Sequence, residues 1–425
     1  MTVSAYARTD RQSALCIQCS TDHRTEQQGI VVMYPFINCL ITLYYLRRLR
    51  MKKKRRRYHV HPVIANRLLE GEFSTLFSKL RNYNEKFSDY FGMSVKSFDE
   101  LLARIQDHIK HHNMFRIPVR PVVRLAVTLR YLRTGQTFSD LHFSYQLGKS
   151  TICLIVREVC LTIWNVLHSE CLSLPRFPED WLKIASGFEQ VANFPNCVGC
   201  LDGKHVRIVC PEKSGSLFLN YKKHFSINLL AMCDSEYRFT YIHVGSCGSD
   251  SDSTIFKNTS LYTKLHNGEL NLPSAKPLPN TTEPMPYVLI GDGAFGISNK
   301  VLRPYVRSNM THKKKIFNYR SSRARRYIES TFGIMSNKFK IFQRSINHSL
   351  PNAIKLVKTC CILHNYIRER DGYKFEDTLT IEGFQNNTNT NNISVVRSGD
   401  VLRDKFANYF VSEVGAIPWQ DDSIF

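Results

Sequence analysis

The chain has 425 residues, with 58 Lys and Arg against 36 Asp and Glu, a formal net charge of +22, and 43% hydrophobic residues. This composition excludes intrinsic disorder over most of the chain, because it supplies enough apolar surface for a sizeable core. A net positive charge this large is most often found in proteins that bind phosphate groups, either those of nucleic acid or those of an anionic membrane surface.

The 13 cysteines indicate a reducing compartment, because their number is odd and their spacing lacks the density of a disulfide-stapled secreted domain. Two Cys-x-x-Cys pairs occur, Cys16/Cys19 and Cys197/Cys200, far apart in the sequence. A joint zinc site is the alternative, and it would need ligands from the N-terminus and from a strand-like run.

The N-terminus combines an 18-residue apolar stretch at 29–46 with nine basic residues at 47–57 (RRLRMKKKRRR). A membrane anchor is conceivable, since 18 residues is the lower length limit for a span. Pro35, Asn38 and Thr42 interrupt the stretch and no cleavage signature follows, so we do not expect a membrane protein. The basic run predicts a nuclear localisation signal or a phosphate-clamping arm, with a solvated charge block as the alternative. The expected compartment is the nucleus, with the cytoplasm second.

The next segment, 58–173, has the periodicity of helices, with apolar residues three and four apart. This pattern is carried by Phe98, Leu101, Leu102, Ile105 and Ile109, and again by Val123, Ala126, Val127 and Tyr131. Gly135 is expected to end the second of these helices.

A helix-turn-helix pattern follows at 138–159. It consists of a short helix at 138–145, a turn with Gly148, and a helix capped by Ser150. The apolar stripe of that second helix is Ile152, Ile155, Val156 and Val159. DNA reading by this helix and plain packing in a helical bundle are both open from the pattern. Nearby arginines tilt the choice slightly toward DNA.

After a Pro-containing link the period changes from 3.6 to 2, which predicts strands. The expected order is three strands at 197–209, 225–233 and 239–247, a helical segment at 252–265, a strand at 287–291 and a long helix at 322–342. Antiparallel-looking strands followed by helix, strand and helix form an α/β layout of the ribonuclease H type.

We therefore predict four parts of the chain. They are a basic and apolar N-terminal extension (1–57), a helical region with a helix-turn-helix (58–173), a ribonuclease H-like domain (174–370), and a C-terminal tail with an Asn-rich linker and a final helix (371–425).

Four acids occupy chemically informative places. Asp202 lies inside the first strand, Asp252 at a strand-to-helix junction, Asp292 at the end of the fourth strand, and Glu329 on the long helix. An acid within an apolar strand is costly unless it is compensated. Converging carboxylates raise one another's pKa values, and divalent cations are the usual partners that keep them ionised. Asp252 could instead only cap a helix, and Asp250 is then the alternative metal ligand. Asp292 could instead be a turn residue.

Hard oxygen ligands favour Mg²⁺ or Mn²⁺. Two such ions about 3.5–4 Å apart can activate a water or a 3′ hydroxyl and steady the leaving oxygen in phosphodiester cleavage. We expect Asp202, Asp292 and Glu329 to be catalytic and to bind the ions, with Asp252 as a further metal ligand.

Between Asp292 and Glu329 there are ten basic residues and no acidic one. Such one-sided charge beside a metal site suits a polyanionic substrate. The residues that we expect to bind the DNA backbone are Lys313, Lys314, Lys315, Arg320, Arg323, Arg325 and Arg326. For the last two, an ion pair with Glu329 along one helix is the alternative.

A dinucleotide-binding protein is a formal competitor, because GDGAFG at 291–296 follows a strand and matches G-x-G-x-x-G. It fits badly, since no acid lies near twenty residues downstream to hold a ribose and Asp292 would repel the pyrophosphate.

Six ordered blocks make the sequence recognisable: GCLDGKHVRI, NYKKHFSINLLAMCD, GSCGSDSDSTIF, IGDGAFG, FNYRSSRARRYIESTFG and CCILHN. Over 58–425 the chain resembles the Harbinger (PIF/Harbinger) transposase-derived nuclease family. The resemblance implies a DDE superfamily endonuclease with a ribonuclease H-like fold after a helix-turn-helix region. It also implies a divalent metal held by acids that map onto Asp202, Asp252, Asp292 and Glu329.

In that family a separate Myb/SANT-like protein is thought to supply DNA targeting and nuclear import, so such a partner is expected besides DNA. His364 and Asn365 of CCILHN are expected to pack within a helix, with a supporting role at the metal site as the alternative. The leading hypothesis is a metal-dependent, transposase-derived nuclease. The alternative is a catalytically silent DNA- or protein-binding nuclear factor that keeps the fold.

Overall fold

The computed structural model describes residues 39–44, 58, 60–112, 117–308, 310–372 and 398–422. The chain divides into two compact units, Met1–His61 and Pro62–Phe425. In the first unit, residues 39–44 form a short helix with exposed side chains. Several features predicted from the sequence lie outside the described residues: the rest of the apolar stretch at 29–46, the basic run at 47–57, Cys16 and Cys19, and the Asn-rich linker.

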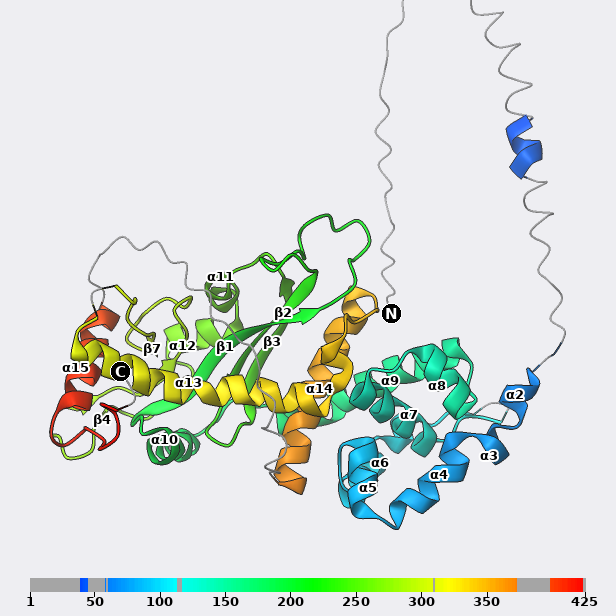
Figure 1. Cartoon of the computed structure of the whole chain (residues 1–425), viewed down its shortest axis with the longest axis horizontal. Coiled ribbons are helices and arrows are strands. Elements are labelled where there is room, and N and C mark those ends of the chain that lie inside the picture. The colour runs from blue at the N-terminus through cyan, green and yellow to red at the C-terminus, as the bar shows by residue number, and fades with distance from the viewer. Residues whose placement is uncertain are drawn as a thin grey trace, which may run out of the picture. The chain divides into compact units, whose positions relative to one another are not determined.

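The second unit begins with a set of helices (Figure 1). Their bounds are α2 (Pro62–Ala65), α3 (Arg67–Glu70), α4 (Glu72–Arg81), α5 (Asn84–Phe91), α6 (Val95–Ile105), a 3₁₀ turn (Gln106–His108), α7 (Pro121–Thr134), α8 (Phe138–Tyr145) and α9 (Lys149–Cys171). As expected, Gly135 ends α7, with a left-handed φ of 64° that favours glycine. The predicted cap at Ser150 is wrong, because α9 begins at Lys149 and its N-cap residue is Gly148.

Among the described residues, α9 is the one helix long and apolar enough to cross a membrane by length and composition. Its packing gives another reason for that composition. Nine of its side chains are buried, and the helix packs against α7, α8 and α14 (Leu350–Asp371). The apolar face of α9 therefore belongs to the protein core.

The α/β class predicted from the sequence is confirmed, and the sheet is mixed. Its five strands lie in the order β3 (Phe239–Cys247), β2 (Ser226–Cys233), β1 (Cys197–Arg207), β6 (Val288–Ile290) and β7 (Val301–Leu302). Strands β1, β2 and β3 are antiparallel, whereas β6 and β7 run parallel to β1. A separate pair is formed by β4 (Lys276–Pro277) and β5 (Pro284–Met285). The four predicted strands are confirmed, and β7 was not foreseen.

Helices cover both faces of the sheet (Figure 1). One face packs on α13 (His312–Lys338) and α14, and the other on α11 (Asp252–Lys257), α12 (Ser260–Asn267) and part of α10 (Pro178–Ala192). The segment predicted as one helix at 252–265 is thus two short helices. A 3₁₀ turn (Lys340–Gln343) follows α13, and the last helix, α15 (Ser398–Val411), packs against α13. This final helix was predicted.

Helix α14 lies between the sheet and the N-terminal helices (Figure 1). Asn365 hydrogen-bonds both backbone groups of Phe239 on β3 and the carbonyl of Cys171 at the end of α9, at 2.6–2.9 Å. His364 is buried and its Nε2 lies 2.8 Å from the Tyr237 carbonyl oxygen. Both residues of CCILHN therefore join structural elements, as the packing interpretation predicted.

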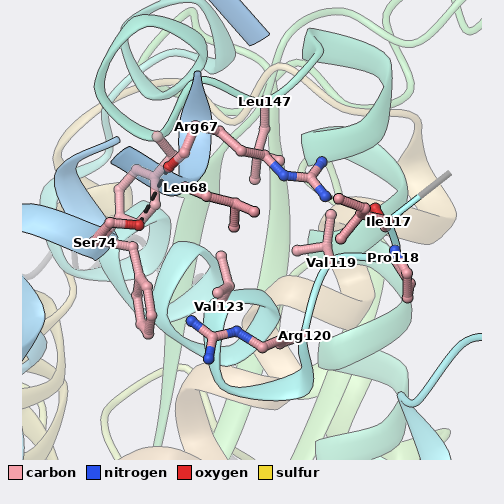
Figure 2. Close-up of a pocket in the computed structure, with 11 residues that line it drawn as sticks. Arg67, Leu68, Ser74, Ile117, Pro118, Val119, Arg120, Val123 and Leu147 are labelled. Carbon is pink, nitrogen blue, oxygen red and sulfur yellow. Dashed lines mark hydrogen bonds between the residues drawn. The ribbon is translucent and has the colours of Figure 1, made fainter. Parts of the chain in front are cut away.

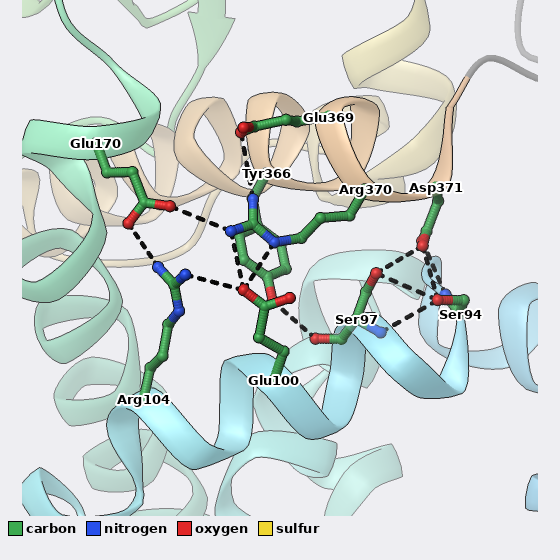
Figure 3. Close-up of polar contacts among 9 residues, drawn as sticks. All are labelled: Ser94, Ser97, Glu100, Arg104, Glu170, Tyr366, Glu369, Arg370 and Asp371. Carbon is green, nitrogen blue, oxygen red and sulfur yellow. Dashed lines mark hydrogen bonds and ion pairs between the residues drawn. The ribbon is translucent and has the colours of Figure 1, made fainter.

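A polar network fixes the far end of α14 to α6 and α9 (Figure 3). Arg370 pairs with Glu100 at 2.9 Å and with Glu170 at 3.1 Å, and Arg104 contacts the same two acids. Asp371 accepts hydrogen bonds from the backbone and hydroxyl of Ser94 at the start of α6. The helices and the sheet belong to one compact unit, Pro62–Phe425. The predicted domain boundary at 173/174 therefore stays a prediction.

Candidate active site

Asp202 lies on β1, and Asp292 lies two residues past the end of the neighbouring parallel strand β6. The register pairs Cys200 of β1 with Ile290 of β6, and each Asp stands two residues further along its own chain. Two positions is one full period of a strand, so both acids leave the sheet on the face that carries Cys200 and Ile290. Asp292 is held by a turn in which its Oδ1 accepts a 2.9 Å hydrogen bond from the Ala294 N–H.

Asp252 approaches the same strand from another side. It is the first residue of α11, whose N-cap Ser251 accepts from the Thr254 N–H. The Asp252 carboxylate lies so close to Gly203 that a Cβ there would come within 2.2 Å of Oδ1, so this strand position requires glycine. Asn228 on β2 donates a 2.7 Å hydrogen bond to the same oxygen. Asp252 is therefore an acid held against β1 at Gly203, the residue after Asp202, as well as the start of a helix.

Glu329 is contributed by α13, one helical turn after Arg325. The Arg325 guanidinium donates to Glu329 at 3.1 Å and lies 4.0 Å from Asp202. The Arg325 side chain is only 7% exposed, while those of Asp202 and Glu329 are 17% and 29% exposed. The predicted ion pair between Arg325 and Glu329 is thus present, and it draws Glu329 toward the acid on β1.

Burial and mutual repulsion mark the four acids as one electrostatic cluster. Burial raises the pKa of Asp202 to about 8; the Arg325 guanidinium opposes this rise, and the charges of the other three acids add to it. Burial also raises the pKa of Asp252 to about 6, against the Asn228 hydrogen bond and with the charge of Asp292. The sequence analysis predicted such mutual perturbation for converging carboxylates.

Lys204 lies close to the acid cluster, and the sequence analysis did not identify it as a site residue. It follows Asp202 by two positions on β1, and its ammonium donates to the Ser336 hydroxyl on α13 at 2.6 Å. Burial lowers the pKa of Lys204 to about 8, while the negative charge of Asp202 works in the opposite direction. A buried cation at this position balances part of the charge of the acids.

The donor chemistry fits a hard divalent cation, because the cluster offers carboxylate oxygens whose mutual repulsion a cation would relieve. Within the described ranges, however, no three His, Cys, Asp or Glu side chains stand close enough together to hold an ion as the side chains are arranged. Arg325 bonds the oxygen of Glu329 instead. The two cysteines of the Cys197/Cys200 pair are buried in β1, where the Cys200 thiol donates to the Ala324 carbonyl at 3.0 Å.

These pKa shifts lead to a testable pH dependence of stability in a chelating buffer. Between the ordinary carboxyl pKa and the raised values, the folded chain keeps protons that the unfolded chain has released. Rising pH then favours the unfolded state at these two acids, so their contribution to the free energy of unfolding should fall from about pH 5 to about pH 8, by up to about 1.4 kcal/mol per pH unit and group. Buried histidines such as His364, whose pKa burial lowers to about 3, contribute the opposite slope below about pH 6.5 and are the same in wild type and in Asp202→Asn. Urea unfolding of both proteins at several pH values isolates the contribution of Asp202 as the difference between the two profiles, and identical profiles would contradict the assignment.

The predicted DNA-gripping residues of α13 have different surroundings. Arg320 is buried and donates to the Gly415 carbonyl at 3.0 Å, with its guanidinium over the Phe410 ring. Arg323 donates to Asn193 at the end of α10 at 3.1 Å. These two arginines join α13 to neighbouring segments.

The other basic residues of this group lie nearer the surface. Lys313 donates to Asn408 on α15 at 3.1 Å, and the Lys314 ammonium lies 5.6 Å from the centre of the Tyr305 ring. Lys315 and Arg326 are exposed. The predicted contacts of this segment with DNA remain predictions, and these two exposed residues are the best placed to make them.

A separate cavity of about 340 Å³ lies in the helical region (Figure 2). Its lining is largely apolar, with Leu68 and Val123 among the side chains that point into it. Arg67 closes one side by donating to the Ile117 carbonyl at 2.5 Å. None of the four acids contributes to this lining, so the cavity and the acid cluster are distinct features.

The comparisons with known proteins concern the part of the chain that carries these acids. Residues 201–365, which include all four acids, match the family model described as DDE superfamily endonuclease. "Protein ALP1-like" of Arabidopsis thaliana is 25% identical over 337 residues, which cover 76% of this chain and 80% of that protein. "Putative nuclease HARBI1" of Rattus norvegicus is 25% identical over 253 residues, 58% of this chain and 67% of that protein. No solved structure matches the chain.

The similarity to Harbinger-derived nucleases is thus confirmed by relatives as well as by motifs. The matched segment begins on β1 just before Asp202 and ends within α14 at Asn365. Residues 201–365 of this chain are thus similar to the DDE superfamily endonuclease domain.

Proposed function

We propose that the chain is a divalent-metal-dependent endonuclease, derived from a transposase, that cleaves phosphodiester bonds of DNA. The observation that carries the proposal is the cluster of Asp202, Asp252, Asp292 and Glu329, in which burial and neighbouring charges raise the pKa of Asp202 to about 8. Strongly perturbed acids at one place are typical of functional sites. The mixed sheet with helices on both faces supports a ribonuclease H-like fold for this domain.

In this proposal the four acids hold Mg²⁺ or Mn²⁺, and Asp202, Asp292 and Glu329 are the catalytic ligands. A bound ion of this kind supplies a lowered pKa for the attacking water or hydroxyl and charge stabilisation for the leaving oxygen. The protein's own groups position the acids. Asn228 orients Asp252, and Arg325 keeps Glu329 turned toward the sheet.

DNA binding is proposed for two surfaces. The first is the exposed part of α13 and its flanks, where the sequence between Asp292 and Glu329 has ten basic residues and no acidic one. The second is the pair α8 and α9, which we propose as a helix-turn-helix. Lys149, Ser150, Leu154 and Arg157 leave the core along one exposed side of α9.

The compartment and the partner are also proposals. The nucleus is supported by the basic run at 47–57, which has the composition of an import signal. A Myb/SANT-like protein remains the proposed partner, on the strength of the family resemblance. The relatives' names do not mention such a partner.

A nicking assay on supercoiled duplex DNA tests the proposed activity. The purified chain should convert supercoiled to open-circular DNA in Mn²⁺ or Mg²⁺ and not in chelator. The competing function is a silent nuclear factor that binds DNA or protein. DNA binding without cleavage in any metal or on any substrate would favour that factor over the enzyme.

Substitutions on α9 test the helix-turn-helix. Replacing exposed Leu154 and Arg157 by Ala should change which DNA sequences are selected from a random pool, because side chains near the start of such a helix touch groove edges. The salt dependence should lose no more than about 0.9 in slope, the share of one phosphate contact. Asn165→Ala, on an exposed position further along α9, is the control. An unchanged selection would show that α9 serves packing alone.

A further inference from the structure

A cavity of about 170 Å³, lined by both polar and apolar groups, has Asp292 of the acid cluster in its wall. The turn after β6 contributes Asp292 and Gly293, and the loop after β7 contributes Pro304, Tyr305 and Arg307. Helix α13 contributes Asn318, Ser321, Ser322 and Arg325. These four positions are spaced i, i+3, i+4 and i+7, and so share one face of the helix. Glu329 continues this face one turn later, so the cavity and the acids lie along one stripe of α13.

The walls of the cavity are held by hydrogen bonds between two lining residues and by contacts of the lining with α15. The Asn318 amide accepts from the Tyr305 N–H at 2.7 Å and donates to the Tyr305 carbonyl at 2.9 Å. The Tyr305 hydroxyl donates to Asp404 of α15, and the Arg403 guanidinium stacks over its ring at 3.8 Å. The loop after β7 is therefore held in place against α13, and the cavity is a built feature of the fold.

Two residues that line this cavity each carry a buried donor with no partner among the described residues. Ser321 is 1% exposed and Arg325 is 6% exposed. Within the part of the chain that the structure describes, the Ser321 hydroxyl and the Arg325 Nε make no hydrogen bond. A buried polar group left unsatisfied costs about 1–3 kcal/mol, so both positions call for a ligand with acceptor oxygens.

The donors of the lining suit an anion. Two guanidinium groups, those of Arg307 and Arg325, line the cavity together with the carboxylate of Asp292, and Arg325 also pairs with Glu329 through its terminal nitrogen. Guanidinium and hydroxyl donors together match the oxygens of a phosphate group, which accepts several charge-assisted hydrogen bonds. Because the cavity touches Asp292 itself, an occupant of this kind would lie next to the reacting position.

We propose that this cavity is a phosphate subsite, which binds a backbone phosphate of the DNA strand adjacent to the phosphodiester that is cut. The inference rests on the proposed nuclease function and adds to it the residues that position the DNA strand relative to the acids. Ser321 and Arg325 donate from the buried wall of the site, and Arg307 closes it from the exposed side. The subsite thereby fixes which phosphodiester faces Asp292 and Asp202.

Binding of the full chain to duplex DNA in chelating buffer tests this subsite without relying on cleavage. Arg307→Gln removes one phosphate contact, so the slope of log affinity against log salt should flatten by about 0.9. Ser321→Ala removes a neutral donor, so affinity should fall about threefold to tenfold at unchanged slope. Because the Ser321 hydroxyl has no partner to lose, its removal should leave the melting temperature equal or higher.

The double variant and a matched control sharpen the result. If Arg307 and Ser321 bind the same phosphate, the double variant should lose less affinity than the sum of the single losses. Arg176→Gln changes an exposed arginine outside the cavity and should keep the wild-type slope. An Arg307→Gln slope equal to that of wild type, or a Ser321→Ala variant that binds like wild type, would overturn the subsite. So would the absence of any DNA binding.

The outcomes for the subsite and for the enzyme are separable. Coupled losses in DNA affinity from a chain that cuts nothing would keep the subsite and reject the nuclease. Metal-dependent cleavage with an unmoved salt slope and independent single losses would keep the nuclease and reject the subsite.

Discussion

Asp202→Asn is expected to abolish metal-dependent cleavage while leaving the fold intact. Asparagine keeps the shape of the side chain and removes one ligand charge, which is worth several kcal/mol of transition-state stabilisation, so the rate should drop by about a thousandfold or more. The nicking assay measures the rate. In chelator at neutral pH the variant should melt at the same temperature as wild type or higher, because the substitution removes one of four clustered acids.

Asp250→Asn is the matched control for this family of variants. Asp250 lies two positions before Asp252, is exposed, and accepts from the Cys247 N–H in its own loop. Its replacement should leave cleavage near the wild-type rate, while Asp252→Asn should lower it. A fully active Asp202→Asn protein would show that the catalytic site lies elsewhere.

Arg325→Met is expected to give the largest loss of stability among substitutions at the site. The side chain is 7% exposed and is the cation that lies 3.1 Å from Glu329 and 4.0 Å from Asp202. Removing one partner of a buried ion pair typically costs 3–5 kcal/mol, and the partial exposure of Glu329 places the expected loss near about 3 kcal/mol. Urea unfolding in chelator measures it. Added Mn²⁺ should restore part of the loss, because a cation bound to the folded acids supplies the missing positive charge.

Arg326→Met serves as the control, since this neighbour on α13 is exposed. Its substitution should change the free energy of unfolding by less than about 0.5 kcal/mol. Equal effects at the two positions, or a loss at Arg325 that divalent cations leave unchanged, would show that Arg325 serves helix packing rather than charge balance.

The sequence predicted the strands well because short apolar runs bounded by polar turns are a local signal, which holds even for β2 and β6, where every residue is buried. It also assigned the four acids to their elements, because a charge inside an apolar strand, at the end of a strand, at the start of a helix or on one helix face needs a compensating partner. It underestimated α13, which begins at His312 instead of near 322. The first turns are basic, and the residues that make them helical, Ile316 and Phe317, are buried in contacts with distant segments that include α15.

Other parts of the site depend on tertiary proximity that no local pattern carries. Asn228 is an ordinary polar residue of a strand until α11 brings Asp252 to it. Gly203 follows Asp202 directly, but its need for a missing Cβ comes from the same long-range approach. Ser321 and Arg307 become neighbours of one cavity only when the loop after β7 folds onto α13. Lys204 could have been noted, because a lysine inside an apolar strand calls for a partner as an acid does.

Helix α14 fixes the distance between α9 and the sheet that carries Asp202. Thr359 donates to the Cys160 carbonyl of α9, and Asn365 bonds both the end of α9 and the backbone of β3, the strand two places from the one that carries Asp202. With the ion pairs of Arg370 at its far end, this helix sets a constant spacing between the exposed side of α9 and the acids. A DNA segment read by α9 and cut at Asp202 would then be broken at a fixed number of base pairs from the sequence that is recognised, because one rigid helix connects the two sites.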